Sequence, residues 1–225
     1  MRRASAAADA YRRARRPSGR TPWRRAAFCV VDLETTGLDP RRHAIVAWSA
    51  VPVDGGRIVL GGAREGLARP VDGVPPASVR IHGLREADLA AAPPLSEATD
   101  ALLETMAGRV LVAHAAWVER AFLSRALRRR GARLRGPVVD TSVLGRLWLS
   151  ERDGGAPPAL PLSGLARALA LPVHRPHSAA GDALTTAQAF IALAAHLDSL
   201  GGETVRSLAD AQQCLRMSGL SAHFR

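Results

Sequence analysis

Phe28–Pro40 reads FCVVDLETTGLDP, an apolar run that two carboxylates interrupt and a Thr-Thr-Gly turn closes. Its β-prone residues predict a strand over about 27–33, and because strand side chains alternate between faces, Asp32 and Glu34 point to the same side. Neighbouring carboxylates at a strand end repel each other, and a divalent cation such as Mg²⁺, which prefers oxygen ligands, relieves that repulsion. The segment therefore indicates a metal site; taken alone, it also fits an edge strand with a solvated polar face.

The charge of the chain is strongly positive and unevenly placed. The 225 residues carry a net charge of +11, and all 31 basic residues are arginines. Residues 1–27 hold nine arginines against one acid, Asp9, which gives +8 and leaves +3 for residues 28–225. We therefore expect residues 1–26 to form a basic, disordered leader. Such a leader is either a solvated extension or a loose contact for a polyanion, and its composition also resembles an organellar transit peptide.

Cysteine content and hydropathy restrict the other classes of protein. Two cysteines, Cys29 and Cys214, are too few for a disulfide framework or a zinc site. No apolar stretch reaches the ~18 residues of a membrane span, and no apolar core of a secretory signal is present. A reducing cytoplasm is the expected location, and no membrane partner is expected.

Apolar periodicity and turn signals place the remaining elements. Two strands are expected at 43–53 and 57–68, joined by an Asp-Gly-Gly hairpin turn at 54–56. The sequence then predicts a Pro-rich loop at 69–80, helices over 95–106 and about 118–130, and strands at 109–114 and 137–140. Asp140 would cap a helix that runs to 149, and a flexible joint at 151–161 precedes helices at 162–171, 178–197 and 203–216. An antiparallel start followed by strand–helix–strand–helix predicts an α/β domain with a mixed sheet.

Three further candidate residues lie at the edges of these elements. Glu119 opens the helix after the fourth strand, His177 directly precedes the long Ala-rich helix, and Asp182 lies in the first turn of that helix. Each has a simpler explanation by itself, because Glu119 and Asp182 would complement a helix dipole and His177 would be an ordinary loop histidine. Their functional interpretation comes from their combination with Asp32 and Glu34.

The combination resembles the DEDDh 3′–5′ exonucleases, the family of the DNA polymerase III epsilon proofreading subunit. The first motif of that family is Asp-x-Glu-Thr-Thr-Gly, which 32–37 reproduce in full, and its third is His-x-Ala-x-x-Asp, which 177–182 match. Ile81-His82-Gly83-Leu84 and Val139-Asp140-Thr141 also resemble family segments. The resemblance covers about 28–197.

The resemblance implies a fold and a division of the chain. The expected fold is ribonuclease H-like, with three layers in which helices flank a central mixed sheet of five strands. The basic leader would occupy 1–26, the exonuclease domain 27–200, and a C-terminal helix and tail 201–225.

The second motif departs from the family pattern. The family reads His-Asn-Ala-x-Phe-Asp, whereas this chain reads His114-Ala-Ala-Trp-Val-Glu119. Glu119 keeps the charge of the usual Asp but is one methylene longer, and Mg²⁺ tolerates poor geometry badly. The change would shift metal preference toward Mn²⁺, slow the reaction, be absorbed by a small helix displacement, or mark a decayed site.

The resemblance also implies roles for these residues. Two divalent metal ions, Mg²⁺ or Mn²⁺, would be held by the four carboxylates, which are Asp32, Glu34, Glu119 and Asp182. His177 would act as the general base for water, and terminal phosphodiesters of DNA or RNA would be cleaved to nucleoside 5′-monophosphates. Thr35, Thr36 and the loop around His82 would bind the terminal nucleotide. The expected partner is the 3′ end of a nucleic acid, and no sliding-clamp or polymerase-binding motif is visible.

Two other functions compete with this one. The altered second motif fits a catalytically weakened or inactive nucleic-acid-binding module on the same fold. A small-molecule phosphohydrolase would use the same metals, and release of phosphate from a free mononucleotide would reveal it.

Overall fold

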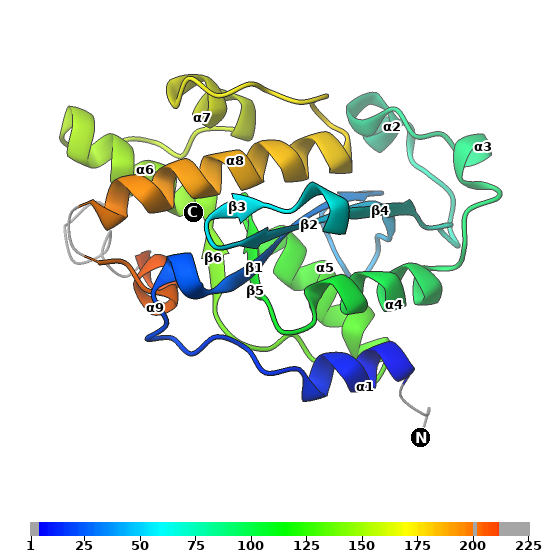
Figure 1. Cartoon of the computed structure of the whole chain (residues 1–225). Coiled ribbons are helices and arrows are strands. Elements are labelled where there is room, and N and C mark those ends of the chain that lie inside the picture. The colour runs from blue at the N-terminus through cyan, green and yellow to red at the C-terminus, as the bar shows by residue number, and fades with distance from the viewer. Residues whose placement is uncertain (1–4, 200–201, 212–225) are drawn as a thin grey trace.

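The computed structural model describes residues 5–199 and 202–211 and centres on one mixed sheet (Figure 1). The strand order is β3-β2-β1-β5-β6, and β4 also pairs with β2. The strands are β1 (Ala27–Thr35), β2 (Ile45–Asp54), β3 (Arg57–Ile58), β4 (Arg64–Leu67), β5 (Val110–Ala113) and β6 (Val138–Asp140). β1 runs antiparallel to β2 and parallel to β5, which in turn runs parallel to β6. The α/β class and the mixed sheet are confirmed.

The sheet has six strands rather than the five expected, because the strand predicted at 57–68 is divided. A short 3₁₀ turn, Leu60–Gly62, separates β3 from β4, and both pair antiparallel with β2. The adjacent Gly61 and Gly62 explain the break, since glycine weakens the interior of a strand. The hairpin turn is as expected, with Gly55 and Gly56 both at positive φ.

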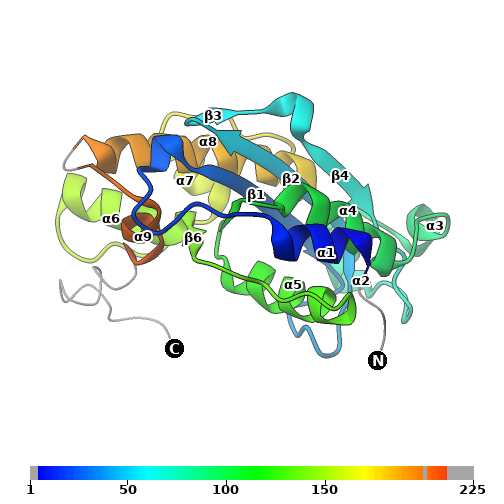
Figure 2. The ribbon, with the colours of Figure 1, turned by 60° about the horizontal axis from the view of Figure 1, so that its bottom comes forward.

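Helices cover both faces of the sheet and make three layers (Figure 2). One face packs against α6 (Thr141–Asp153), α7 (Leu162–Ala168), α8 (Ala179–Asp198) and α9 (Val205–Ala209); the other packs against α1 (Ala6–Arg13), α4 (Leu95–Met106) and α5 (Trp117–Arg129). β1 supplies both cores in alternation, with Phe28 and Val30 facing α8 and Cys29 and Val31 facing the opposite helices. This alternation fixes which face receives Asp32.

The Pro-rich stretch is not a plain loop. It contains α2 (Pro76–His82), and α3 (Glu86–Leu89) follows it. Pro76 occupies the first helical turn, where the missing N–H of proline costs nothing, and Gly83 ends the helix at a φ of 75°. Helices this short contain too few residues for apolar periodicity to distinguish them from a loop.

The expected disorder of residues 1–26 is wrong for the part that the structure describes. α1 places Tyr11 on the α4 side of the sheet with 1% of its surface exposed. Trp23 is also 1% exposed and packs edge-on against Phe190 of α8, with ring centroids 6.2 Å apart. The arginines of this segment lie between apolar residues that belong to the two cores. The high charge therefore gave no indication that the segment is part of the folded domain. The boundary predicted at residue 26 therefore does not separate a free leader from the domain.

The C-terminal prediction is only partly within the described residues. The helix expected at 203–216 begins at Val205 and is described as helical to Ala209, and 212–225 lie outside the described residues. Among the residues that the structure describes, no helix is long and apolar enough to cross a membrane.

Candidate active site

β1 brings two carboxylates to the face of the sheet that α8 covers. Asp32 and Glu34 continue the alternation of Phe28 and Val30, so both side chains reach the α8 side at the carboxyl end of the strand. Glu34 is only 9% exposed, which means that its charge is held away from bulk water.

The first turn of α8 supplies the third carboxylate. Ser178 caps this helix by accepting a hydrogen bond from the Gly181 N–H, and Asp182 accepts one from the backbone N–H of His177 at 3.0 Å. Gly181 is required here, because a Cβ at this position would lie 2.2 Å from the carbonyl oxygen of His174. The close approach holds the loop with His177 against the helix.

Three carboxylates converge at this point. Asp32, Glu34 and Asp182 each offer an oxygen within 4.8 Å of the other two. Burial is the main cause that raises the pKa of all three, to about 7 for Glu34. Repulsion from neighbouring carboxylates adds to the rise in pKa for Asp32 and Glu34, whereas the His177 N–H and the charge of His177 partly offset it for Asp182. This cluster is one that a divalent cation stabilises, because carboxylate oxygens are the ligands that Mg²⁺ and similar ions prefer.

Glu119 faces the cluster from α5 but is not part of the group within 4.8 Å among the described residues. Its side chain is 5% exposed and its Oε2 has no hydrogen-bond partner. Burial raises its pKa to about 8, and its charge is the largest electrostatic contribution to the raised pKa of Asp32. A buried carboxylate oxygen without a partner is costly, and a cation between Glu119 and Asp32 would compensate it. The donor set therefore fits divalent metal ions.

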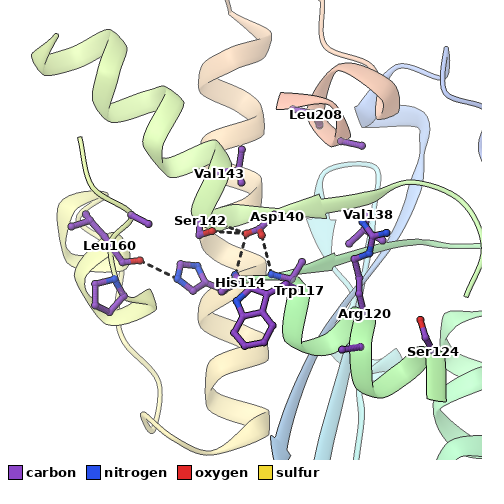
Figure 3. Close-up of a pocket in the computed structure, with 16 residues that line it drawn as sticks. His114, Trp117, Arg120, Ser124, Val138, Asp140, Ser142, Val143, Leu160 and Leu208 are labelled. Atoms are coloured by element: carbon purple, nitrogen blue, oxygen red, sulfur yellow. Dashed lines mark hydrogen bonds between the residues drawn. The ribbon is translucent and has the colours of Figure 1, made fainter. Parts of the chain in front are cut away.

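Asp140 has a larger role than the helix cap that the sequence indicated. It caps α6 as expected, accepting hydrogen bonds from the N–H and hydroxyl of Ser142. It also accepts the backbone N–H groups of Ala115 at 3.0 Å and Ala116 at 2.9 Å, directly before α5 (Figure 3). Asp140 thus positions the start of the helix that carries Glu119. The sequence alone did not predict this second role of Asp140.

The turn before α5 contains a strained residue. Ala115 has a φ of 53°, in the left-handed region that non-glycine residues avoid and that Asn tolerates better than Ala. This is the position at which the resembling family has Asn. His114, next to it, hydrogen-bonds through Nδ1 with the Thr141 hydroxyl at 3.0 Å. Its Nε2 hydrogen-bonds with the Leu160 carbonyl oxygen at 3.1 Å (Figure 3). The turn is therefore held rigidly in spite of the strain.

A cavity of about 380 Å³ adjoins the carboxylates, and Glu34, Trp48, His82 and His177 all line it. His177 is exposed. His82 accepts a hydrogen bond from the Leu84 N–H through Nδ1 at 3.1 Å, whereas its buried Nε2 has no partner. Burial also lowers the pKa of His82. The structure thus brings both histidines to one cavity beside the carboxylates.

Thr35 and Thr36 are placed differently. Neither lines this cavity. The Thr36 N–H donates to the Ala44 carbonyl at 2.9 Å and its hydroxyl accepts the Ala44 N–H at 3.0 Å, so both groups close the turn after β1. The Thr35 hydroxyl donates to the Gly37 carbonyl at 2.9 Å. In this structure the two threonines shape the turn, and their role toward a nucleotide stays a prediction.

The sheet order and the carboxylates at the end of β1 define an α/β protein with the ribonuclease H-like fold. The chain belongs to the RNase_T exonuclease family, whose sequence profile matches residues 29–190. The resemblance to the DEDDh exonucleases is confirmed at the level of family and fold.

Individual relatives agree with this assignment. The chain is 35% identical over 182 residues to a DNA polymerase III subunit epsilon-like protein of Rhodobacter capsulatus, which covers 80% of this chain and 25% of that protein. It is 29% identical over 177 residues to the PolC-type DNA polymerase III of Thermotoga maritima, covering 78% of this chain and 12% of the relative. The chain therefore spans a quarter or less of these two relatives.

A solved structure shows the same fold. Exonuclease X in complex with 5′-overhanging duplex DNA superimposes with a TM-score of 0.62 at 24% identity, covering 82% of this chain and 98% of that one.

Proposed function

We propose that this protein is a metal-dependent 3′–5′ exonuclease that hydrolyses terminal phosphodiesters of DNA or RNA and releases nucleoside 5′-monophosphates. The observation that carries the proposal is the convergence of Asp32, Glu34 and Asp182 within 4.8 Å, with buried Glu119 facing them, in a chain of the exonuclease family. Four carboxylates with raised pKa values have no simple structural purpose, because burying them without a counter-ion destabilises the protein.

These four residues would hold two divalent ions, Mg²⁺ or Mn²⁺. When bound, the ions supply Lewis-acid polarisation of the phosphate and lower the pKa of water toward neutrality. The protein contributes a fixed set of oxygens: β1 is held on both sides in the sheet, and the Asp182 carboxylate is oriented by the His177 N–H. Preorganised ligands of this kind need no rearrangement during the reaction.

His177 would take the proton of the attacking water. It is exposed and lies on a loop tied to Asp182, and its left-handed backbone, with a φ of 61°, directs the N–H toward that carboxylate. A histidine with access to both solvent and the carboxylates suits proton transfer near neutral pH.

The cavity beside the cluster would receive the terminal nucleotide. This cavity of about 380 Å³ is lined by Trp48, which offers an apolar ring, and by His82, whose imidazole would contact the ligand. Arg175 on the rim would approach a phosphate. Thr35 and Thr36, which close the turn after β1, would contribute backbone groups to the nucleotide site.

The altered second motif supports a second candidate, a catalytically weakened nucleic-acid-binding module. The observation that favours it is the separation of Glu119 from the group within 4.8 Å. We favour the active enzyme because Glu119 is buried, unpartnered and electrostatically coupled to Asp32. The location that we propose is a reducing cytoplasm, which suits the free, buried thiol of Cys29.

Digestion of end-labelled oligonucleotides tests the proposal. Purified protein with Mg²⁺ or Mn²⁺ is incubated with matched DNA and RNA labelled at the 5′ end, and with the same strands blocked at the 3′ end. We expect a ladder of shortened 5′-labelled products, no digestion of blocked strands, and no activity in a chelator or in the Asp32→Asn variant. Digestion of 3′-blocked strands from the other end would contradict the direction, and inactivity with both metals on both substrates would support the weakened module.

A further inference from the structure

A second cavity, of about 630 Å³, lies on the α5 side of the sheet, and five of its sixteen lining residues are arginines. We call it the basic pocket. Its walls come from the turn after β1, the segment after β4, the start of α4 and the second half of α5. The arginines that line it are Arg41, Arg42, Arg69, Arg125 and Arg129.

The charge of the basic pocket is largely uncompensated. Asp72 is the one carboxylate among the lining residues, against five arginines. Within residues 5–199 and 202–211, no carboxylate forms an ion pair with any of the five, although seven arginines elsewhere on the chain do form such pairs. Clustered guanidinium groups without anions repel one another, so the pocket favours a ligand with more than one negative charge.

Two of the five arginines are already oriented by the backbone. Arg125 donates to the Pro40 carbonyl oxygen, and Arg69 donates to the Ala90 carbonyl oxygen at 3.2 Å. These contacts join α5 to the turn after β1 and the segment after β4 to α3. A guanidinium has five N–H donors, so each keeps further donors for an anion.

The basic pocket and the active site share one segment, the turn from Thr36 to Ala44. At its start, this turn follows directly on Thr35, the last residue of β1 and the neighbour of Glu34 in the carboxylate cluster. At the other end, His43 lines the basic pocket and lies 3.4 Å from the Thr36 hydroxyl. The turn thus leads from the carboxylates on the α8 face of the sheet to the arginines on the α5 face, and a polymer that passes round this end of the sheet would reach both.

We propose that the basic pocket binds the phosphodiester backbone of the same nucleic-acid strand whose 3′ end occupies the carboxylate site. The proposal rests on the proposed function. Arginine side chains can bind two phosphate oxygens at once. The lining also includes Ile45, Leu95 and Phe122, apolar groups suited to sugars or bases rather than to a lone phosphate. The pocket thus acts as a second grip that favours long substrates over short ones.

The test replaces arginines of the pocket that have no side-chain hydrogen bond in the described structure. The variant is R41Q/R42Q/R129Q, which leaves the contact between Arg125 and Pro40 in place. The matched control, R57Q/R128Q/R133Q, removes the same charge from exposed arginines outside the pocket. Circular dichroism and thermal melting verify that both variants fold as the natural protein does.

Binding of a fluorescent single-stranded oligonucleotide is measured by anisotropy in a chelator, over a range of salt. Each lost phosphate contact lowers the slope of log K against log[salt] by about 0.7, so three lost contacts should lower it by about 2 and weaken binding about 10²-fold near 0.1 M salt. The control should keep the slope of the natural protein. Turnover of a dinucleotide with Mg²⁺ should be equal in all three proteins.

Three results would overturn the proposal: an unchanged slope in the pocket variant, an equal loss in the control, or an equal loss of affinity for a mononucleotide and the oligonucleotide. The last would show a site for a single free phosphate. Failure of the proposed function is distinguishable, because a natural protein that binds the oligonucleotide with the expected slope but digests nothing leaves the pocket assignment intact.

Discussion

Replacing Glu119 by Gln should stabilise the metal-free protein and remove its activity at the same time. Burial raises the pKa of Glu119 from 4.5 to about 8. At pH 7, Glu119 is therefore protonated in the folded protein but ionised in the unfolded chain. Because pH 7 lies about 2.5 units above the ordinary pKa of 4.5, this difference lowers the free energy of unfolding by about 3 kcal/mol, at 1.36 kcal/mol per unit. Gln fills the same volume without that proton, so the melting temperature at pH 7 should rise by about 6–12 °C.

The pH dependence follows from the same shift. Because the folded-state pKa is raised, the metal-free natural protein has full stability from this group below about pH 4.5 and loses it as the pH rises to about 8. The Glu119→Gln variant should not show this pH-dependent loss of stability. The remaining slope should come from the raised pKa values of Glu34 and Asp32.

The assay is thermal and urea denaturation in a chelator between pH 5 and about 8, beside single-turnover digestion with Mg²⁺ and with Mn²⁺. Glu119→Gln should lower turnover more than about 10²-fold, as for loss of a preorganised electrostatic group. Glu104→Gln on α4, an exposed carboxylate, is the control and should change stability by less than about 0.5 kcal/mol.

Two outcomes would refute the reasoning. Glu119→Gln that is less stable than the natural protein in a chelator would show that the carboxylate makes a stabilising contact. Full activity in both metals would place Glu119 outside the site. Glu119→Asp should also lose activity, because a shorter side chain lies still farther from the other carboxylates; a faster Asp variant would favour the weakened-site alternative.

Three further predictions concern the scaffold and the base. Ala115→Gly should stabilise the protein by about 1 kcal/mol in urea denaturation because it relieves a φ of 53°, whereas Ala116→Gly, at a φ of −56°, should not; equal effects would contradict the strain. Trp23→Ala should cost about 3–5 kcal/mol through lost packing on Phe190, and a melting temperature unchanged in this variant would restore the idea of a free leader. His177→Asn should lower turnover about 10²–10⁴-fold, because Asn tolerates the left-handed backbone but cannot act as the base. The affinity for Mn²⁺, measured by calorimetry, should not change; loss of both turnover and affinity would make His177 a ligand.

Local pattern was sufficient for much of the fold and for the grouping of three of the candidate carboxylates. The alternation in β1 predicted that Asp32 and Glu34 share a face, and the helix over Leu95–Met106 has the predicted bounds. Asp182 follows from its position in the first turn of a helix with a clear start. Such features depend on the periodicity of one segment and on motif order, which a sequence displays directly.

Other features depend on contacts between distant segments, which no local pattern contains. The charge of residues 1–26 suggested a solvated leader, yet two apolar anchors, Tyr11 and Trp23, place the segment in both cores. The position of Asp140 in the sequence predicted a helix cap. Its hydrogen bond to the turn before α5 arises only because β5 pairs with β6.

The separation of Glu119 from the other three carboxylates likewise depends on how α5 sits against the sheet. The sequence by itself therefore determined the elements and the chemical types at the site, because periodicity and motif order reside in single segments. Tertiary packing decided the distances between carboxylates, the strain before α5 and the charge gathered in the basic pocket, because each of these joins side chains from segments far apart along the chain.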